Sequence, residues 1–163
     1  MVTGMLTLSD FNSTAFRIHV FAEVATAETL LSRFVQQRLD DGEINEVILD
    51  RDQEQRLKKD KLSGLNYQLC HYMYLKDMIN LIASNKSLYS AIGFASRSQL
   101  EKFNSINDLS NRAAHASKSL IYDRQDAKSV LGRLEKAEEL CFRLRAAGLP
   151  LDCWSTDEQN EAT

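Results

Sequence analysis

The spacing of apolar residues in the first part of the chain predicts one long helix. Between residues 13 and 39 the apolar positions recur at steps of three and four, the period of one helix face. The positions are Phe16, Val20, Val24, Ala27, Leu31 and Phe34. Charged residues such as Arg17 and Glu23 fall between them. The run Asp40-Asp41-Gly42 tolerates turns, so the helix is expected to end there.

A second helical pattern runs from about residue 50 to residue 84. Its apolar stripe consists of Leu57, Leu62, Leu65, Leu69, Met73, Met78, Ile79 and Ile82. Residues 51–61 are mostly charged, which indicates a solvated face or a projecting arm. Gly64 interrupts the pattern and favours either a break or a close helix crossing.

Two shorter helices are predicted in the second half, after an apolar connection over residues 85–95. Ser98 and Glu101 have the spacing of a capping box, which marks the start of the third helix. Its apolar face is formed by Leu100, Phe103, Ile106, Leu109 and Ala113. The last helix is expected from about residue 126 to residue 147, before Gly148 and Pro150. The predicted class is all-α, an up-and-down bundle of four main helices with or without one extra short helix.

Length and composition favour one domain built from long helices. A chain of about 150 residues buries roughly 70% of its unfolded surface, so 163 residues suffice for a core. The sequence has one proline and six glycines, and this scarcity of breakers favours helices over short strands. We expect a single domain over residues 1–151. Residues 152–163 form a polar, acidic tail that is expected to be disordered.

Charge, cysteines and hydropathy narrow the class of protein further. The net charge of −3 argues against a protein that coats nucleic acid, although a local basic patch can still bind it. Cys70, Cys141 and Cys153 are far apart and odd in number, so neither a disulfide framework nor a zinc site is predicted. No signal peptide or long apolar run is visible. We expect a soluble cytoplasmic protein with no membrane contact, no metal and no cofactor.

The candidate chemistry lies in residues 107–121, at the end of the predicted third helix. Asn111, Arg112 and His115 lie within five positions, and each can hydrogen-bond a phosphate or ribose oxygen. His115 can also exchange a proton near neutral pH. Structural roles are open for all three: dipole compensation for His115, a surface ion pair for Arg112 and a helix-end amide for Asn111.

Other polar and aromatic residues are weaker candidates. His19 and His71 lie on apolar helical patterns, which is more typical of partly buried packing histidines than of ligands. Asp123 and Asp126 are interpreted as turn and cap residues rather than an acid-base pair. Three tyrosines can line a groove and stack bases, although their spacing is more typical of core or dimer contacts. They are Tyr67, Tyr72 and Tyr74.

Three segments around this candidate site resemble HEPN domains (higher eukaryotes and prokaryotes nucleotide-binding). They are Ile92-Gly-Phe-Ala-Ser-Arg-Ser-Gln-Leu-Glu-Lys-Phe103, Ile106-Asn-Asp-Leu-Ser-Asn-Arg-Ala-Ala-His115 and Ser117-Lys-Ser-Leu-Ile121. That family is a helical bundle, usually dimeric, whose active members are metal-independent RNases. Its signature is an arginine followed a few residues later by a histidine, often as Arg-Asn-x-x-x-His near the end of the third helix.

The resemblance carries over residue by residue, with one departure. Asn111 matches the polar residue after the arginine and His115 matches the histidine, but Ser110 occupies the place of the arginine. The resemblance implies His115 as acid or base, with Asn111 beside it. Arg112, three residues before His115 and on roughly the same helix face, is the candidate replacement for phosphate binding. Further RNA- or nucleotide-binding residues implied by position are Asn107, Ser110 and Lys118.

The resemblance leads to two hypotheses of function. In the leading hypothesis, a homodimer places two copies of residues 111–115 around one cleft that binds RNA or a nucleotide. The first hypothesis is a metal-independent endoribonuclease in stress response or defence, with an antitoxin or regulatory protein as partner. The second is a catalytically inactive interaction or regulatory module, which Ser110 favours. Residues 67–82 carry more apolar positions than one stripe requires, which also favours a dimer.

Overall fold

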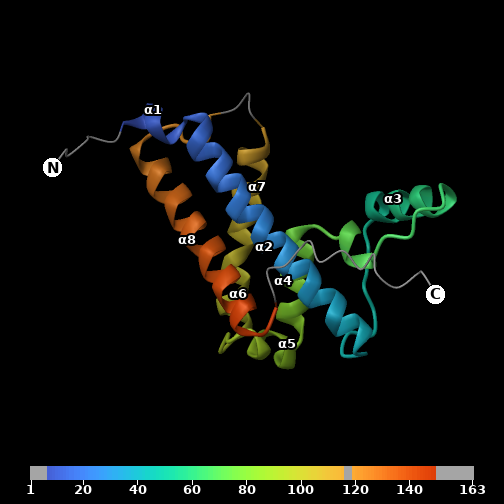
Figure 1. Cartoon of the computed structure of the whole chain (residues 1–163). Helices are drawn as coiled ribbons and strands as arrows, with labels where there is room; N and C mark the ends of the chain where they lie inside the picture. The colour runs from blue at the N-terminus through green and yellow to red at the C-terminus, as the bar shows by residue number, and fades with distance from the viewer. Residues whose placement is uncertain (1–6, 116–118, 150–163) are drawn as a thin grey trace, which may run out of the picture.

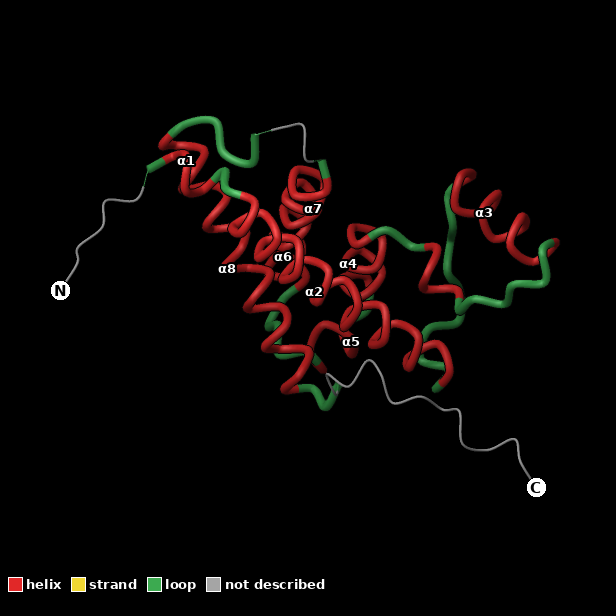
Figure 2. Tube along the Cα trace, turned by 45° about the horizontal axis from the view of Figure 1, so that its top comes forward, coloured by secondary structure: helices red, strands yellow, loops and turns green. Residues whose placement is uncertain are grey.

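The computed structural model describes residues 7–115 and 119–149, and every regular element in these ranges is a helix (Figures 1 and 2). The elements are α1 (Leu8–Phe11), α2 (Thr14–Asp40), α3 (Arg51–Leu62), the 3₁₀ helix η1 (Leu69–Tyr72), α4 (Leu75–Ser84), α5 (Lys86–Ala91), α6 (Arg97–Glu101), the 3₁₀ helix η2 (Lys102–Ser105), α7 (Ile106–Ala114) and α8 (Arg124–Ala146). The predicted all-α class is confirmed. The described residues form more helices than a simple up-and-down bundle of four contains, so that finer prediction is not confirmed.

The core lies between the two longest helices and the elements that cover them. α2 packs beside α8 and also contacts α7 and α4, so it is the central helix of the bundle (Figure 1). Fully buried residues from each of these helices meet there. Examples are Leu31, Ile79, Leu109 and Leu140.

The predicted first helix is confirmed as α2. The Ser13 hydroxyl accepts a hydrogen bond from the Phe16 amide at 3.3 Å, and so caps the first turn. After the helix, Gly42 takes a φ of +72°, a left-handed conformation in which a side chain is disfavoured. A cap at one end and a glycine at the other fix its length.

The prediction of one helix from residue 50 to 84 is wrong, because three separate elements occupy this range. Gly64 has a φ of +78°, which ends α3 and turns the chain toward η1. The apolar residues continue at helical spacing across the break, so the periodicity alone did not show it. The alternative of a break at Gly64, together with a projecting charged arm, is what the structure shows (Figure 2).

Polar contacts attach α3 to the rest of the molecule. Gln53 is its buried residue. The Gln53 side chain and Asp50 form a reciprocal capping box, with both hydrogen bonds at 2.8 Å. The Gln53 amide also donates to Asp77 at the start of α4, at 2.7 Å. This helix is therefore held at its N-terminal end by one buried amide rather than by an apolar face.

The capping box predicted at Ser98 and Glu101 is wrong by two positions. Ser96 is the N-cap of α6, and its hydroxyl accepts from the Gln99 amide at 3.3 Å. The Gln99 side chain accepts from the amide that precedes Ser96, at 3.0 Å. Glu101 instead pairs with Arg97 at 2.6 Å. Both serines fit the sequence pattern for a capping box, so spacing alone could not separate them.

The predicted third helix consists of α6, η2 and α7 in succession, and the last helix is confirmed as α8. Gly148, with a φ of +91°, follows its end. Lys118, Pro150, Cys153 and the expected tail over residues 152–163 lie outside the described residues. Within the described ranges, no helix is long and apolar enough to cross a membrane.

Most of the apolar residues between 67 and 82 are buried within the chain itself. Those buried are Cys70, Tyr72, Met73, Leu75, Met78, Ile79 and Ile82. The chain turns between η1 and α4, so these residues reach the core from two elements rather than from one helix stripe. Tyr67 and Tyr74 remain exposed. The apparent surplus therefore no longer requires a dimer contact, and dimerisation stays a prediction.

Candidate functional site at the end of α7

The predicted site lies where α7 ends. The helix stops at Ala114, and His115 follows it with extended backbone angles, φ −96° and ψ 91°. The His115 side chain is exposed. Because His115 has left the helix, its spacing from Arg112 does not place the two side chains on one face. The geometric reason for treating them as a pair is therefore lost.

Arg112 is engaged in contacts within the chain. Its Nη1 donates to both carboxylate oxygens of Asp126, at 2.8 and 2.9 Å, and to the Leu120 carbonyl at 3.4 Å. The guanidinium also lies 5.5 Å from the centroid of the Tyr122 ring. The side chains are 28% exposed for Arg112 and 16% for Asp126. This ion pair links α7 to the start of α8. It corresponds to the alternative prediction for Arg112, which is an ion pair rather than a ligand contact.

The surroundings of Asp126 favour its charged form. Burial by itself would raise its pKa, but the Tyr122 amide and the Arg112 guanidinium outweigh burial and lower the pKa. The Tyr122 amide donates at 3.0 Å. Asp123, in contrast, is the N-cap of α8, since its carboxylate accepts from two amides of the first turn at 2.8 Å. The cap interpretation is confirmed for Asp123, whereas Asp126 is mainly an ion-pair partner.

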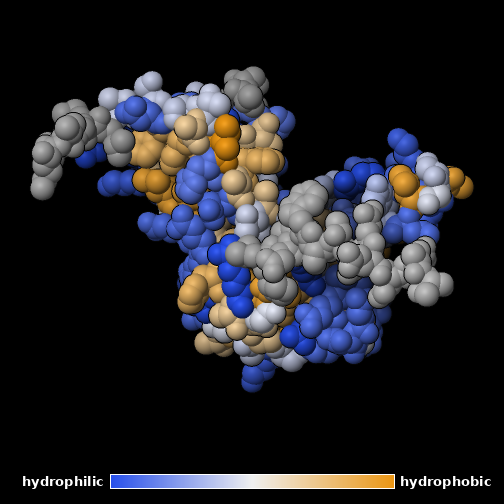
Figure 3. Space-filling view, in the orientation of Figure 1, coloured by the Kyte–Doolittle hydropathy of each residue, from blue (hydrophilic) through white to orange (hydrophobic). Residues whose placement is uncertain are grey.

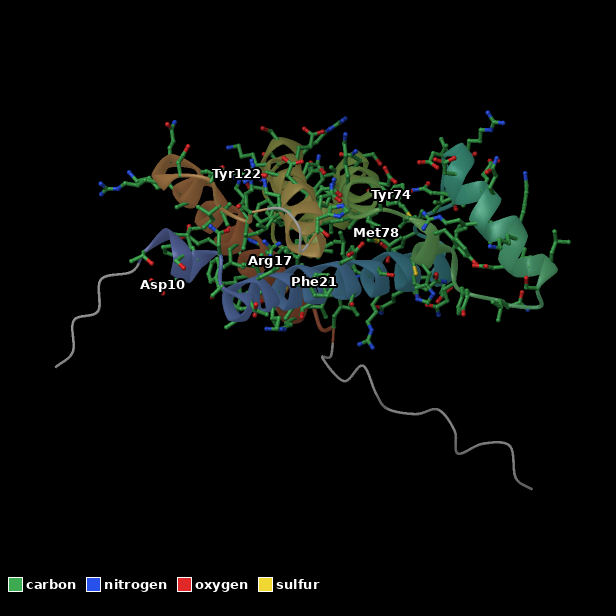
Figure 4. All side chains as sticks on the ribbon, turned by 90° about the horizontal axis from the view of Figure 1, so that it is seen from above. Asp10, Arg17, Phe21, Tyr74, Met78 and Tyr122 are labelled. Carbon is green, nitrogen blue, oxygen red and sulfur yellow. The ribbon has the colours of Figure 1, made fainter. Side chains whose placement is uncertain are left out.

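Arg17, on α2, binds the C-terminal end of α7. Its Nη1 donates to the Arg112 carbonyl at 2.8 Å and to the His115 carbonyl at 3.2 Å. Carbonyls at a helix end lack partners in the helix and carry its partial negative charge, so a guanidinium there is stabilising. Figure 4 shows Arg17 on α2, at the same end of the molecule as Tyr122. Sequence reasoning missed this role.

Asn12 provides a second link at this end of the molecule. Its side-chain amide donates to the Ile121 carbonyl at 2.7 Å, and its side-chain oxygen accepts from the Ile121 amide at 3.0 Å. This pairing joins the residues before α2 to the residues before α8. Asn12 and Arg17 contact partners roughly a hundred positions away, so no local sequence signal could reveal them.

The other predicted site residues are less constrained. Asn111 is exposed, whereas Asn107 and Ser110 are half-buried. No side-chain hydrogen bond joins any of these three to another described residue. Lys118 lies outside the described residues. The structure thus brings His115 and Asn111 to one exposed helix end and adds Arg17 and Asp126 from neighbouring helices.

The remaining candidates do not add a catalytic group to this site. The expectation that His19 and His71 are partly buried is wrong, since both are exposed, with ring contacts to Phe16 at 6.4 Å and Tyr67 at 6.1 Å. Cys141 is buried, and burial raises the pKa of its thiol to about 11. Among the described residues no group of histidines, cysteines and carboxylates is arranged to hold a metal ion.

Comparison of the chain with protein-family models, with curated proteins and with solved structures finds no match. The fold and the site alone therefore define the class of protein. It is an all-helical protein in which an exposed histidine and amide stand at a helix end. The two neighbouring guanidiniums hold backbone carbonyls and a carboxylate.

Proposed function

We propose that this chain is a HEPN-like helical module that binds RNA or a protein partner through the end of α7 without cleaving RNA. The observation that carries this proposal is the Arg112–Asp126 ion pair. Cleavage at a phosphate needs a fixed positive charge where negative charge develops in the transition state. Serine occupies position 110, and the nearest arginine is directed at a carboxylate. The proposed catalytic arrangement lacks its cation.

The energetic cost of releasing Arg112 supports the same conclusion. A hydrogen-bonded ion pair of this burial contributes about 1–3 kcal/mol, and breaking it would also leave Asp126 without its guanidinium. An exposed phosphate contact would have to offset that loss before it contributed to binding or catalysis. The guanidinium is therefore better suited to fixing the junction between α7 and α8.

A homodimer remains part of the proposal, with its contact on α2. Ile18 and Phe21 are 62% and 50% exposed on the N-terminal part of this helix, next to Arg17. Figure 3 shows apolar side chains gathered over this part of the molecule, and Figure 4 shows Phe21 and Arg17 on the same helix. Two subunits joined through this face would bring their α7 ends close together. The proposed setting is the cytoplasm, in stress response or defence, with an antitoxin or regulatory protein as a further partner.

The test is a gain-of-function experiment. Purified native protein and the Ser110→Arg variant are incubated with labelled single-stranded RNA and with tRNA, without added metal. We expect no cleavage by the native protein and measurable cleavage by the variant, which should disappear when His115→Ala is added. An equally inactive Ser110→Arg variant that still binds RNA would count against a HEPN-like site.

The endoribonuclease is the second candidate, favoured by the exposure of Asn111 and His115 at one helix end. In this version RNA must draw Arg112 away from Asp126. Cleavage by the native protein that is lost in His115→Ala, and retained in His19→Ala, would establish it. His19 is a matched control because it is also an exposed histidine, on a different helix.

A further inference from the structure

Two cavities share His71 in their linings, in a part of the molecule formed by residues other than those of the α7 site. The larger, about 540 Å³, lies between α2, η1 and α4. The smaller, about 450 Å³, lies between α3 and η1. His71 lines both, so the two cavities are neighbours on either side of this residue. Met78, which lines the larger cavity, lies between α4 and α2 in Figure 4, and Tyr74 lies toward α3.

The smaller cavity carries an excess of positive charge. Arg56 and Lys59 line it from α3. Arg56 is held in place, since its Nη2 donates to the Tyr72 carbonyl at 3.3 Å and its guanidinium lies 5.2 Å from the centroid of the Tyr74 ring. Lys59 forms no ion pair with another described residue. An ammonium beside a positioned guanidinium is suited to a phosphate group.

Asp60 also lines the smaller cavity and offsets one of the two positive charges, so one net positive charge remains. Its carboxylate accepts a hydrogen bond from the Tyr72 hydroxyl at 3.0 Å, which directs one oxygen toward the wall. Tyr67 and His71 add aromatic surface, with ring centroids 6.1 Å apart in an edge-to-face arrangement. Rings of this kind stack on planar ligands. The cavity thus combines cations with aromatic surface.

The larger cavity is lined by polar and apolar side chains, and Arg33, which is engaged in another contact, is among them. Glu28 lines it, and burial raises the pKa of this carboxyl. Glu28 forms no ion pair with another described residue, so its oxygens are available to a ligand. Gln68 adds an amide, while Met73 and Met78 supply sulfur and methyl surface. Carboxylate and amide groups of this type pair with the amino and ring nitrogens of nucleobases.

We propose that the two cavities form one binding site for a free nucleotide. The phosphate lies against Arg56 and Lys59, and the base enters the larger cavity toward Glu28 and Gln68. His71 contacts the ligand where the two parts meet. The cavity volumes fall in the range of about 300–1,000 Å³ that is typical of small-molecule sites. This site shares no residue with the α7 end, so it does not depend on the function proposed there.

The test is titration calorimetry with the four common nucleoside 5′-monophosphates, their nucleosides and inorganic phosphate. We expect at least one monophosphate to bind about tenfold more tightly than its nucleoside. Lys59→Gln should remove most of that difference. Lys61→Gln should not, because Lys61 is an exposed lysine of the same helix that does not line the cavity. Equal effects of the two variants would overturn the assignment of the phosphate.

Glu28→Gln tests the assignment of the base. The variant keeps the shape of the side chain but changes its hydrogen-bonding pattern, so the order of preference among the four bases should change. The preference for a phosphate over a nucleoside should persist. Unchanged base preferences would contradict the placement of the base near Glu28.

Two outcomes would overturn the proposal as a whole. One is the absence of binding by every monophosphate at millimolar concentration. The other is binding of RNA oligonucleotides through Lys59 without binding of any mononucleotide, which would make these cavities part of an RNA path. The nucleotide titrations of the Lys59 and Glu28 variants and the RNA-cleavage assay of Ser110→Arg are separate measurements on separate residues, so the failure of this site and the failure of the α7 proposal can be told apart.

Discussion

The end of α7 and the α3–η1 end use their cations differently. At the α7 end, Arg112 is bound to Asp126, and Arg17 donates to two backbone carbonyls. At the other end, Arg56 is positioned by Tyr72 and Tyr74 but faces a cavity, beside a lysine without an ion pair among the described residues. The sequence motif therefore marks the region where cations stabilise the fold, while a region without a motif presents them to solvent.

The same contrast holds for how each end is attached. α7 carries Ile106, Leu109 and Ala113 in the core, so it is held by apolar burial. α3 stands apart from the other long helices (Figure 2), has one buried residue, Gln53, and is held by polar contacts. Because apolar burial contributes more free energy than a few partly solvated hydrogen bonds, the two ends should respond differently to substitution.

The largest effect is expected from truncating the core face of α7. Leu109 is fully buried, so Leu109→Ala should lower the free energy of unfolding by about 2–5 kcal/mol. Leu62→Ala, at an 89% exposed leucine of α3, should change it by less than about 0.5 kcal/mol. Chemical denaturation measures both. Similar losses in the two variants would show that α3 is packed in solution.

Breaking the Arg112–Asp126 pair should have the next largest effect. Asp126→Asn and Arg112→Gln should each lower the free energy of unfolding by about 1–3 kcal/mol. The double variant should lose less than the sum of the two, since each single change already removes the shared contact. Arg124→Gln is the control, because Arg124 is an exposed arginine of α8, the helix that carries Asp126. Additive losses would mean that the two side chains do not interact.

Loosening of α3 should be a local effect. Gln53→Ala removes the buried amide that binds Asp77, so we expect faster hydrogen exchange in α3. The free energy of local opening should fall by about 1–3 kcal/mol. Amides of α2 and α8 should exchange as before. Gln55→Ala, an exposed glutamine on the same helix, should leave α3 unchanged. Faster exchange throughout the protein would contradict the separate attachment of this arm.

The smallest expected effects are changes of the free energy of unfolding with pH, and they have opposite signs for Asp126 and Glu28. The lowered pKa of Asp126 stabilises the fold above the unfolded value of about 4, and this contribution is lost as the pH falls through the folded value. The raised pKa of Glu28 has the reverse effect, because its stabilisation is present below about pH 4 and is lost as the pH rises.

Denaturation at several pH values checks both signs. At neutral pH, Glu28→Gln should therefore be more stable than the native protein and Asp126→Asn less stable. Both differences should shrink in acid. A Glu28→Gln variant that is destabilised at neutral pH would show that this carboxylate has a stabilising partner.

The long helices were predictable because their signals are local. α2 and α8 have regular apolar periods, capping residues at Ser13 and Asp123, and glycines after their ends. The stretch between them was not predictable in the same way. Its apolar residues keep helical spacing on both sides of Gly64, although the backbone turns at this glycine. Periodicity reports which residues are buried, but not whether one helix or several bury them.

The candidate site was predictable in its location but not in its surroundings. Asn111, Arg112 and His115 do lie together at the end of α7, as their sequence proximity requires. The partners Arg17 and Asp126 come from other helices, and their contacts depend on how those helices pack. Whether Arg112 is available to a ligand is therefore a tertiary property, which a short motif does not contain.

The most direct test of the central claim, that the α7 end lacks a cation placed for catalysis, is the rate of RNA cleavage by the native protein and by Ser110→Arg. We expect the native protein to leave single-stranded RNA intact and Ser110→Arg to cleave it in a manner that requires His115. Cleavage by the native protein that is abolished by His115→Ala would contradict the claim, because it would show that Arg112 leaves Asp126 to serve the reaction.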